Sequence, residues 1–132
     1  MQAVTSVDMS NDAFPFLTAR EITVGSVPVT ALRVTYVGEL GWELYAPTEY
    51  GRALWATLWD AGRPHGLVPL GLDALDVVRI EAGLVFAGYE FDDQVDPFEA
   101  GIGFTVPLKT KEDDFSGRDA LLRRKAAEFL KS

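Results

Sequence analysis

Apolar residues alternate with polar ones along the first third of the chain, as they do in strands with one buried face. Residues 20–24 and 27–36 form two such segments, and Gly25-Ser26 between them predicts a two-residue hairpin turn. Pro28, near the start of the second segment, indicates a sheet edge or a bulge, because proline cannot donate a hydrogen bond to a neighbouring strand. The pattern therefore predicts an antiparallel pair of strands.

The stretch around which the rest of the chain is organised runs from Arg33 to Tyr45 and reads R-V-T-Y-V-G-E-L-G-W-E-L-Y. It predicts two short strands joined by a glycine-rich turn, in which Gly38 and Gly41 allow positive φ angles or the close approach of another group. One interpretation is a β-hairpin with solvated glutamates, which is a common structure. The other is a binding site, since two carboxylates and a tyrosine are held around the turn.

Alternation along this stretch assigns its side chains to two faces. After the turn, the residues on one face are Trp42 and Leu44, and those on the other are Glu43 and Tyr45. Before the turn, Tyr36 shares a face with Leu32 and Val34. The pattern alone therefore suits Tyr36 to a core position as well as to a binding site.

Further along the chain, apolar residues recur every three to four positions, which predicts helices. A first helix is expected from an N-cap at Thr48 to about Ala61, where Gly62 ends it. The other predicted elements are a helix at 71–82, a short strand at 104–108 and a final helix at 116–130. Together the elements predict an α+β fold, with helices packed on an antiparallel sheet.

The second predicted helix contains an anomalous arginine. The apolar stripe of this helix is formed by Leu72, Leu75, Val78 and Ala82. At about 100° per residue, Arg79 falls inside that stripe. A buried guanidinium needs acceptors, and Asp76, three residues earlier, is one candidate. The alternative is an arginine whose head group snorkels to water, and the sequence leaves both interpretations open.

Two polar segments carry residue types that are typical of functional sites. The first holds four carboxylates within seven residues, Glu90, Asp92, Asp93 and Asp96. Their spacing lacks the central glycine of an EF-hand loop, so it favours a solvated loop over a calcium site. His65 lies between Pro64 and Gly66 with no candidate partner nearby, and is interpreted as a turn residue instead of a catalytic one. No catalytic residue and no metal site is predicted.

Composition and charge narrow the class of protein. The chain has 132 residues, of which 48% are hydrophobic and 24% charged, as is typical of one folded domain. The formal net charge of −8 argues against a nucleic-acid partner. The absence of cysteine excludes disulfides, and a single histidine excludes a multi-histidine metal site. The sequence shows no signal peptide and no apolar stretch of roughly 18 residues, so no membrane partner is expected. We expect a soluble, cytoplasmic protein.

Four motifs occur in order along the chain: Y-V-G-E-L-G-W-E-L-Y at 36–45, G-L-D-A-L-D-V-V-R-I-E-A-G-L at 71–84, P-F-E-A-G-I-G-F at 97–104 and F-S-G-R-D-A-L at 115–121. Together they resemble the aminomethyltransferase (glycine-cleavage T-protein) family. The run N-D-A-F-P-F-L-T-A-R-E-I-T-V at 11–24 is most similar to the branch fused to flavin enzymes, the dimethylglycine and sarcosine dehydrogenases and oxidases. The resemblance covers nearly the whole chain.

The resemblance implies a folate-dependent function. Members of this family bind tetrahydrofolate and form 5,10-methylenetetrahydrofolate from a one-carbon unit released by an amine such as glycine, dimethylglycine or sarcosine. It implies that Tyr36 and Glu43 line the pterin site and that Arg79 lies near the folate. The chemistry suits these roles, since a pterin ring offers N–H donors to a carboxylate and a face to an aromatic ring. FAD, if used at all, is implied only for an upstream domain that this sequence lacks.

The resemblance also implies a piece of a longer enzyme: residues 1–132 as a single domain, one ferredoxin-like half of the folate-binding domain. The family's upstream segment, which carries the aspartate regarded as catalytic, and its downstream β-barrel have no counterpart here. We therefore expect the isolated chain to be inactive. The alternatives are a non-catalytic folate-binding module and a structural piece. We also expect the cut surfaces, on the first two strands and on the final helix with Phe129 and Leu130, to drive homo-oligomer formation.

Overall fold

A computed structural model describes residues 1–128 of the chain. Contacts within the chain divide it into two compact units, Met1–Leu84 and Val85–Ser132. The described residues contain a three-stranded antiparallel sheet and three α-helices, which confirms the predicted α+β class. The single domain over 1–132 and its ferredoxin-like character stay predictions.

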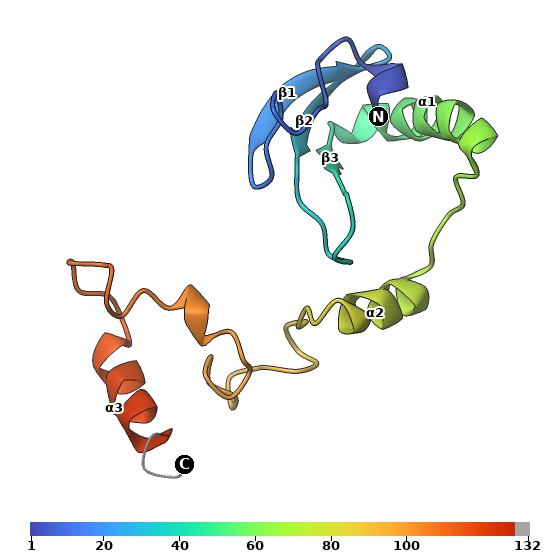
Figure 1. The fold of residues 1–132 in the computed structure, drawn as a ribbon. Helices are drawn as coiled ribbons and strands as arrows, with labels where there is room; N and C mark the ends of the chain where they lie inside the picture. Colours follow the sequence, from blue (N-terminus) through green and yellow to red (C-terminus); the bar gives the residue numbers. More distant parts are fainter. Residues whose placement is uncertain (129–132) are drawn as a thin grey trace. The chain divides into compact units, whose positions relative to one another are not determined.

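The sheet of the first unit consists of β1 (Ala19–Val24), β2 (Val27–Leu32) and β3 (Glu43–Tyr45), in that order and all antiparallel (Figure 1). The predicted hairpin turn at Gly25-Ser26 is confirmed, and Gly25 takes a positive φ of 59°. β2 is the central strand, but β3 pairs with it only from Thr30 to Leu32. Pro28 therefore lies beyond the end of β3, where its missing N–H leaves no ladder bond unmade.

The prediction of a continuous strand over 27–36 is wrong beyond Leu32. Residues 33–42 form an irregular connection between β2 and β3. The backbone of Arg33 bonds to the segment before β1, donating to the Thr18 carbonyl and accepting from Leu17 N–H. Gly38 takes a positive φ of 73°, which turns the chain back toward β3. Tyr36 consequently lies in this loop, half-buried, and not on a strand.

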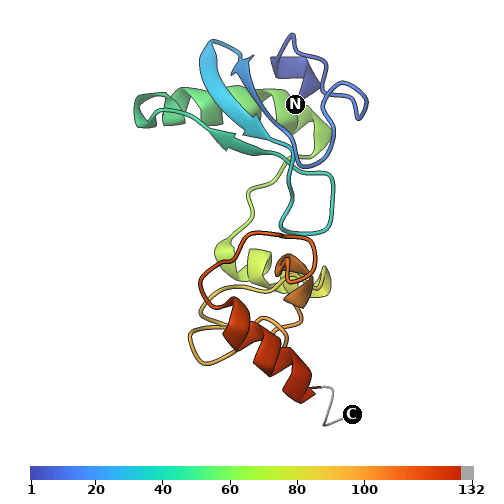
Figure 2. The same cartoon turned by 90° about the vertical axis from the view of Figure 1, so that its left-hand side faces the viewer.

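The core of the first unit lies on one face of the sheet. Its buried residues are Met9, Phe14, Ile22, Val24, Val27, Val29 and Ala31. The short helical turns Gln2–Val4 and Thr48–Tyr50 precede the sheet and α1 (Gly51–Gly62) respectively. α1 lies across this face, with Leu54 and Leu58 packed against the buried cluster (Figure 2). Alternation along the strands thus buries one face and leaves Glu21, Thr23 and Thr30 exposed on the other.

Arg33 fastens the N-terminal segment to the sheet. The residue is 8% exposed, and its guanidinium donates to the Phe14 carbonyl at 2.7 Å and to Asn11 Oδ1. Its Cζ also lies 5.1 Å from the ring centroid of Trp42, whose ring meets Phe14 edge-on at 4.8 Å. The buried charge is therefore satisfied by backbone, amide and aromatic partners together.

α2 (Leu72–Glu81) confirms the predicted second helix, and Gly83 follows it with a φ of 73°. The turn Arg63–His65 lies between α1 and α2. The predicted apolar stripe of α2 is not its buried side, since Leu72 is 82% exposed. The buried residue of this helix is Arg79, at 1%.

The second unit contains an isolated bridge between Ala87 and Phe91, the turn Gly103–Thr105 and α3 (Arg118–Glu128). The predicted strand at 104–108 is wrong, because its first residues complete that turn, in which Val106 N–H donates to the Gly103 carbonyl. The final helix is confirmed but begins at Arg118, after Gly117 with a φ of 89°. Phe129 and Leu130, expected to contribute to a self-association surface, lie outside the described residues.

Candidate functional site

β3 presents Glu43 and Tyr45 on the exposed face of the sheet. The two are separated by one residue, so the period of a strand places them side by side. The Tyr45 hydroxyl donates to Glu43 Oε2 at 2.6 Å. This bond, with the charge of Glu43, raises the pKa of the Tyr45 phenol above its ordinary value. The prediction that these residues share a face, opposite Trp42 and Leu44, is confirmed.

The 33–42 loop that carries Tyr36 is shaped by its two glycines. A Cβ on Gly41 would lie 2.9 Å from the Val34 carbonyl oxygen, so the backbone leaves no room for a side chain there. A Cβ on Gly38 would lie 3.1 Å from the Cβ of Ala82, the residue that follows α2. The close approach predicted from the glycines is therefore the loop packing on itself and on the end of α2.

Arg79 is held by acceptors within its own segment. Its Nε and Nη2 donate to Asp76 Oδ1 at 2.8 and 2.5 Å, and its Nη1 donates to the Leu84 carbonyl at 3.1 Å. Of the two interpretations left open by the sequence, the paired arginine is confirmed and the snorkelling one is wrong. The guanidinium also links α2 to the residues that follow it.

The structure places the three residues implied by the resemblance on three elements, Tyr36 in the 33–42 loop, Glu43 on β3 and Arg79 on α2. Gly38 packs on Ala82, so the loop that carries Tyr36 meets the end of the helix that carries Arg79. Glu43 lies on β3, at the far end of the same loop, and is engaged by Tyr45. Each of these assignments to a folate site stays a prediction.

The sequence analysis did not predict two sets of contacts, the bond from Tyr45 to Glu43 and the bonds from Arg33 to Asn11 and Phe14. The Glu-x-Tyr spacing at 43–45 was a sufficient signal for the bond between the two side chains, because residues two apart on a strand are neighbours on one face. The burial of Arg33 had no comparable signal, since its acceptors at Asn11 and Phe14 are set by how the N-terminal segment folds back.

A separate apolar cleft of about 870 Å³ opens on the other side of β3, in the first unit. Trp42, Trp55 and Trp59 contribute to its walls. The rings of Trp55 and Trp59 stack, with their centroids 6.2 Å apart. Among the described residues that line it, His65 has the only ionisable side chain. Its volume would suit a ligand, but none of the residues implied by the resemblance lines it. The candidate site is therefore the exposed face of β3 that carries Glu43, and not the cleft.

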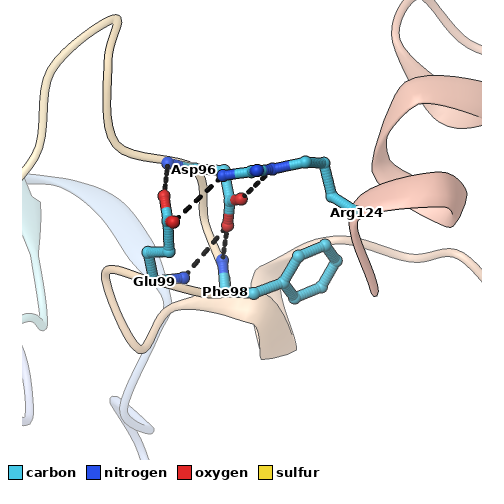
Figure 3. Close-up of polar contacts among 4 residues, drawn as sticks. All are labelled: Asp96, Phe98, Glu99 and Arg124. Carbon is cyan, nitrogen blue, oxygen red and sulfur yellow. Dashed lines mark hydrogen bonds and ion pairs between the residues drawn. The ribbon is translucent and has the colours of Figure 1, made fainter. Parts of the chain in front are cut away.

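In the second unit, an ion-pair cluster joins the turn at 96–102 to α3 (Figure 3). Arg124 donates to Asp96 Oδ2 at 2.7 Å and to Glu99 Oε1 at 3.0 Å. Asp96 Oδ1 accepts from the N–H groups of Phe98 and Glu99. The Glu99 N–H bond above all, with those from Arg124 and Phe98, lowers the pKa of Asp96 below its ordinary value. The carboxylates of this cluster thus have structural partners.

Two other kinds of feature are absent from residues 1–128. Within that range, no group of three or more histidine, aspartate or glutamate side chains is placed to hold a metal ion. In the same part of the chain, no helix combines the length and apolarity needed to cross a membrane.

Residues 1–110 match the GCVT N-terminal domain family, and the chain belongs to this family. It is 58% identical over 112 residues to a trimethylamine-oxide aldolase of Ruegeria pomeroyi, across 85% of this chain and 14% of that protein. It is 50% identical over 112 residues to an aminomethyltransferase of Symbiobacterium thermophilum, across 84% of this chain and 30% of that protein. It is 40% identical over 126 residues to the mitochondrial dimethylglycine dehydrogenase of Homo sapiens, across 96% of this chain and 14% of that protein.

These similarities confirm the family predicted from the four motifs. The chain spans 14–30% of the length of these relatives, so their activities belong to much longer proteins. The names of the relatives also differ in the reaction that they describe.

Proposed function

We propose that this chain contributes a tetrahydrofolate-binding surface to one-carbon transfer, in which a carbon unit released by an amine is captured as 5,10-methylenetetrahydrofolate. The observation that carries the proposal is the Glu43 carboxylate on the exposed face of β3, where it accepts a hydrogen bond from Tyr45. Membership of the GCVT N-terminal domain family supports a folate as the ligand.

Glu43 is the proposed acceptor for the N–H donors of the pterin. A carboxylate accepts such donors through charge-assisted bonds, which are shorter and stronger than neutral ones. Tyr36, in the adjoining loop, would offer a ring face to the pterin. Arg79 is nearly fully enclosed, so its proposed contribution is to hold the end of α2 in place beside that loop.

The test is a calorimetric titration of the chain with tetrahydrofolate, under anaerobic conditions. Glu43→Gln keeps the shape of the side chain and removes its charge, and should weaken binding by about 1.5–3 kcal/mol, roughly ten- to a hundredfold. The matched control is Glu39→Gln, four residues earlier on the exposed tip of the loop, which should leave the affinity unchanged. Equal losses in both variants would indicate a disturbed loop, and no loss at Glu43 would refute its assignment.

The amine substrate is proposed only as a class, a methylated amine or an amino acid. The aldolase and dehydrogenase names among the relatives favour methylated amines. Incubation with tetrahydrofolate and, in turn, glycine, dimethylglycine, sarcosine and trimethylamine oxide tests this proposal in the longer protein. Binding of folate without turnover of any of them would favour the alternative, a non-catalytic folate-binding module.

A further inference from the structure

Tyr45, which is not among the residues implied by the family resemblance, forms a hydrogen-bonded pair with Glu43, which is. The pair lies on β3, with a hydroxyl-to-carboxylate distance of 2.6 Å, and both side chains are exposed, Tyr45 at 56%. We propose that Tyr45 is a positioning residue, whose hydroxyl holds Oε2 of Glu43 so that Oε1 is presented to the ligand. This inference rests on the proposed function, since it concerns the same carboxylate.

The physical reason is the freedom that an exposed glutamate would otherwise keep. Fixing a long side chain of this kind costs up to about 2 kcal/mol of rotamer entropy, which a ligand must otherwise supply on binding. A tyrosine ring has few rotatable bonds, and its hydroxyl reaches the carboxylate from the same strand face. A carboxylate has lone pairs on both oxygens, so Tyr45 can occupy Oε2 and leave Oε1 free to accept.

The surroundings of the pair restrict the chemistry of the ligand. Across the sheet, Tyr45 is opposite Thr30, which is in turn opposite Glu21 on β1. In the described part of the sheet, the row that contains Tyr45 and Thr30 therefore has one charged residue, the carboxylate of Glu21. The part of the ligand that reaches the pair should be a neutral ring bearing N–H donors, because an anion or an acceptor-only ring would be repelled.

The first experiment needs no ligand. The chain has four tyrosines, and their deprotonation is followed by absorbance as the pH is raised. Because the pKa of Tyr45 is raised by its bond to Glu43, Tyr45→Phe should remove one phenol that deprotonates above the ordinary range of tyrosine. Glu43→Gln should return that phenol to the ordinary range. An unchanged titration in Glu43→Gln would overturn the pairing.

The second experiment measures tetrahydrofolate binding in a double-mutant cycle. Tyr45→Phe should weaken binding by about two- to tenfold, the value of one neutral donor's bond. In a Glu43→Gln background the same change should have no further effect, because the partner is gone. Tyr50→Phe, an exposed tyrosine on the turn before α1, is the control and should bind like the wild type.

The outcomes separate the positioning role from the proposed function. No binding by the wild-type chain would contradict the proposed function, while the tyrosine titration would still decide whether the pair forms. Binding that is weakened equally by Tyr45→Phe in both backgrounds would overturn the positioning role and leave the folate site standing. An unaltered affinity in Tyr45→Phe would overturn it as well.

Discussion

Loss of the Asp76 carboxylate should destabilise the first unit, because it leaves a buried guanidinium short of an acceptor. The Arg79 side chain is 2% exposed, and two of its nitrogens donate to one oxygen of Asp76. Removing one partner of a fully buried pair costs about 3–5 kcal/mol. The Asp76 side chain is 44% exposed, so water replaces part of what is lost. We therefore expect Asp76→Asn to lower the free energy of unfolding by about 2 kcal/mol.

The assay is urea unfolding, followed by tryptophan fluorescence and circular dichroism, since all three tryptophans lie in the first unit. Asp73→Asn is the matched control, because Asp73 is exposed in the first turn of the same helix. It loses only a favourable interaction with the helix dipole, about 0.3–0.5 kcal/mol. In an Arg79→Met background, Asp76→Asn should be nearly neutral. A loss in Asp76→Asn no larger than in Asp73→Asn would refute the reasoning.

Four other outcomes are expected. Gly41→Ala should lower the free energy of unfolding by more than about 1 kcal/mol, because its Cβ meets the Val34 carbonyl. Gly51 has a helical φ and open space around it, so Gly51→Ala should raise the free energy of unfolding by about 0.4–1 kcal/mol. Similar urea midpoints for the two variants would contradict this. Asp96 has a lowered pKa in the folded chain, so its contribution to stability is complete above its unfolded pKa near 3.8 and is lost as the pH falls through the lower folded value. The difference in stability between wild type and Asp96→Asn should therefore shrink below about pH 4. A constant difference would count against a stabilising bond between Asp96 and Arg124 on α3. The chain by itself should form no methylenetetrahydrofolate in a coupled assay, because it spans only 14–30% of the length of the three relatives described above and catalytic groups that act as a unit fail together; measurable product would refute this expectation. Sedimentation at roughly tens of micromolar should show dimers or larger species; a monomer throughout that range would count against self-association.

Local patterns in the sequence predicted the elements whose partners are close along the chain. The β1–β2 hairpin follows from alternation and from Gly25-Ser26, and α2 follows from its periodicity and from Gly83. The faces of Glu43 and Trp42 also follow from alternation alone. In each case one short segment contains all the information that the structure uses.

The failures arose where distant residues decide the backbone. The strand does not continue past Leu32, because the backbone of Arg33 bonds to Thr18 and its side chain bonds to the folded N-terminal segment. The predicted strand at 104–108 was ended by the turn that Gly103 starts. At the candidate site, pattern identified the carboxylate but not its geometry, since the tilt of Tyr45 toward Glu43 is a matter of rotamers.

The short pairing of β3 has a consequence for the kinetics of binding. β1 and β2 share six residue pairs across a two-residue turn, whereas β3 is held by three pairs across a long loop and lies at the edge of the sheet. Closing a longer loop costs more entropy, so β3 should detach and return while the first hairpin stays formed. Amide hydrogens of residues 43–45 should therefore exchange with solvent sooner than those of β1 and β2. A ligand that grips Glu43 binds only the attached state, and its association rate is scaled by how often this strand is in place.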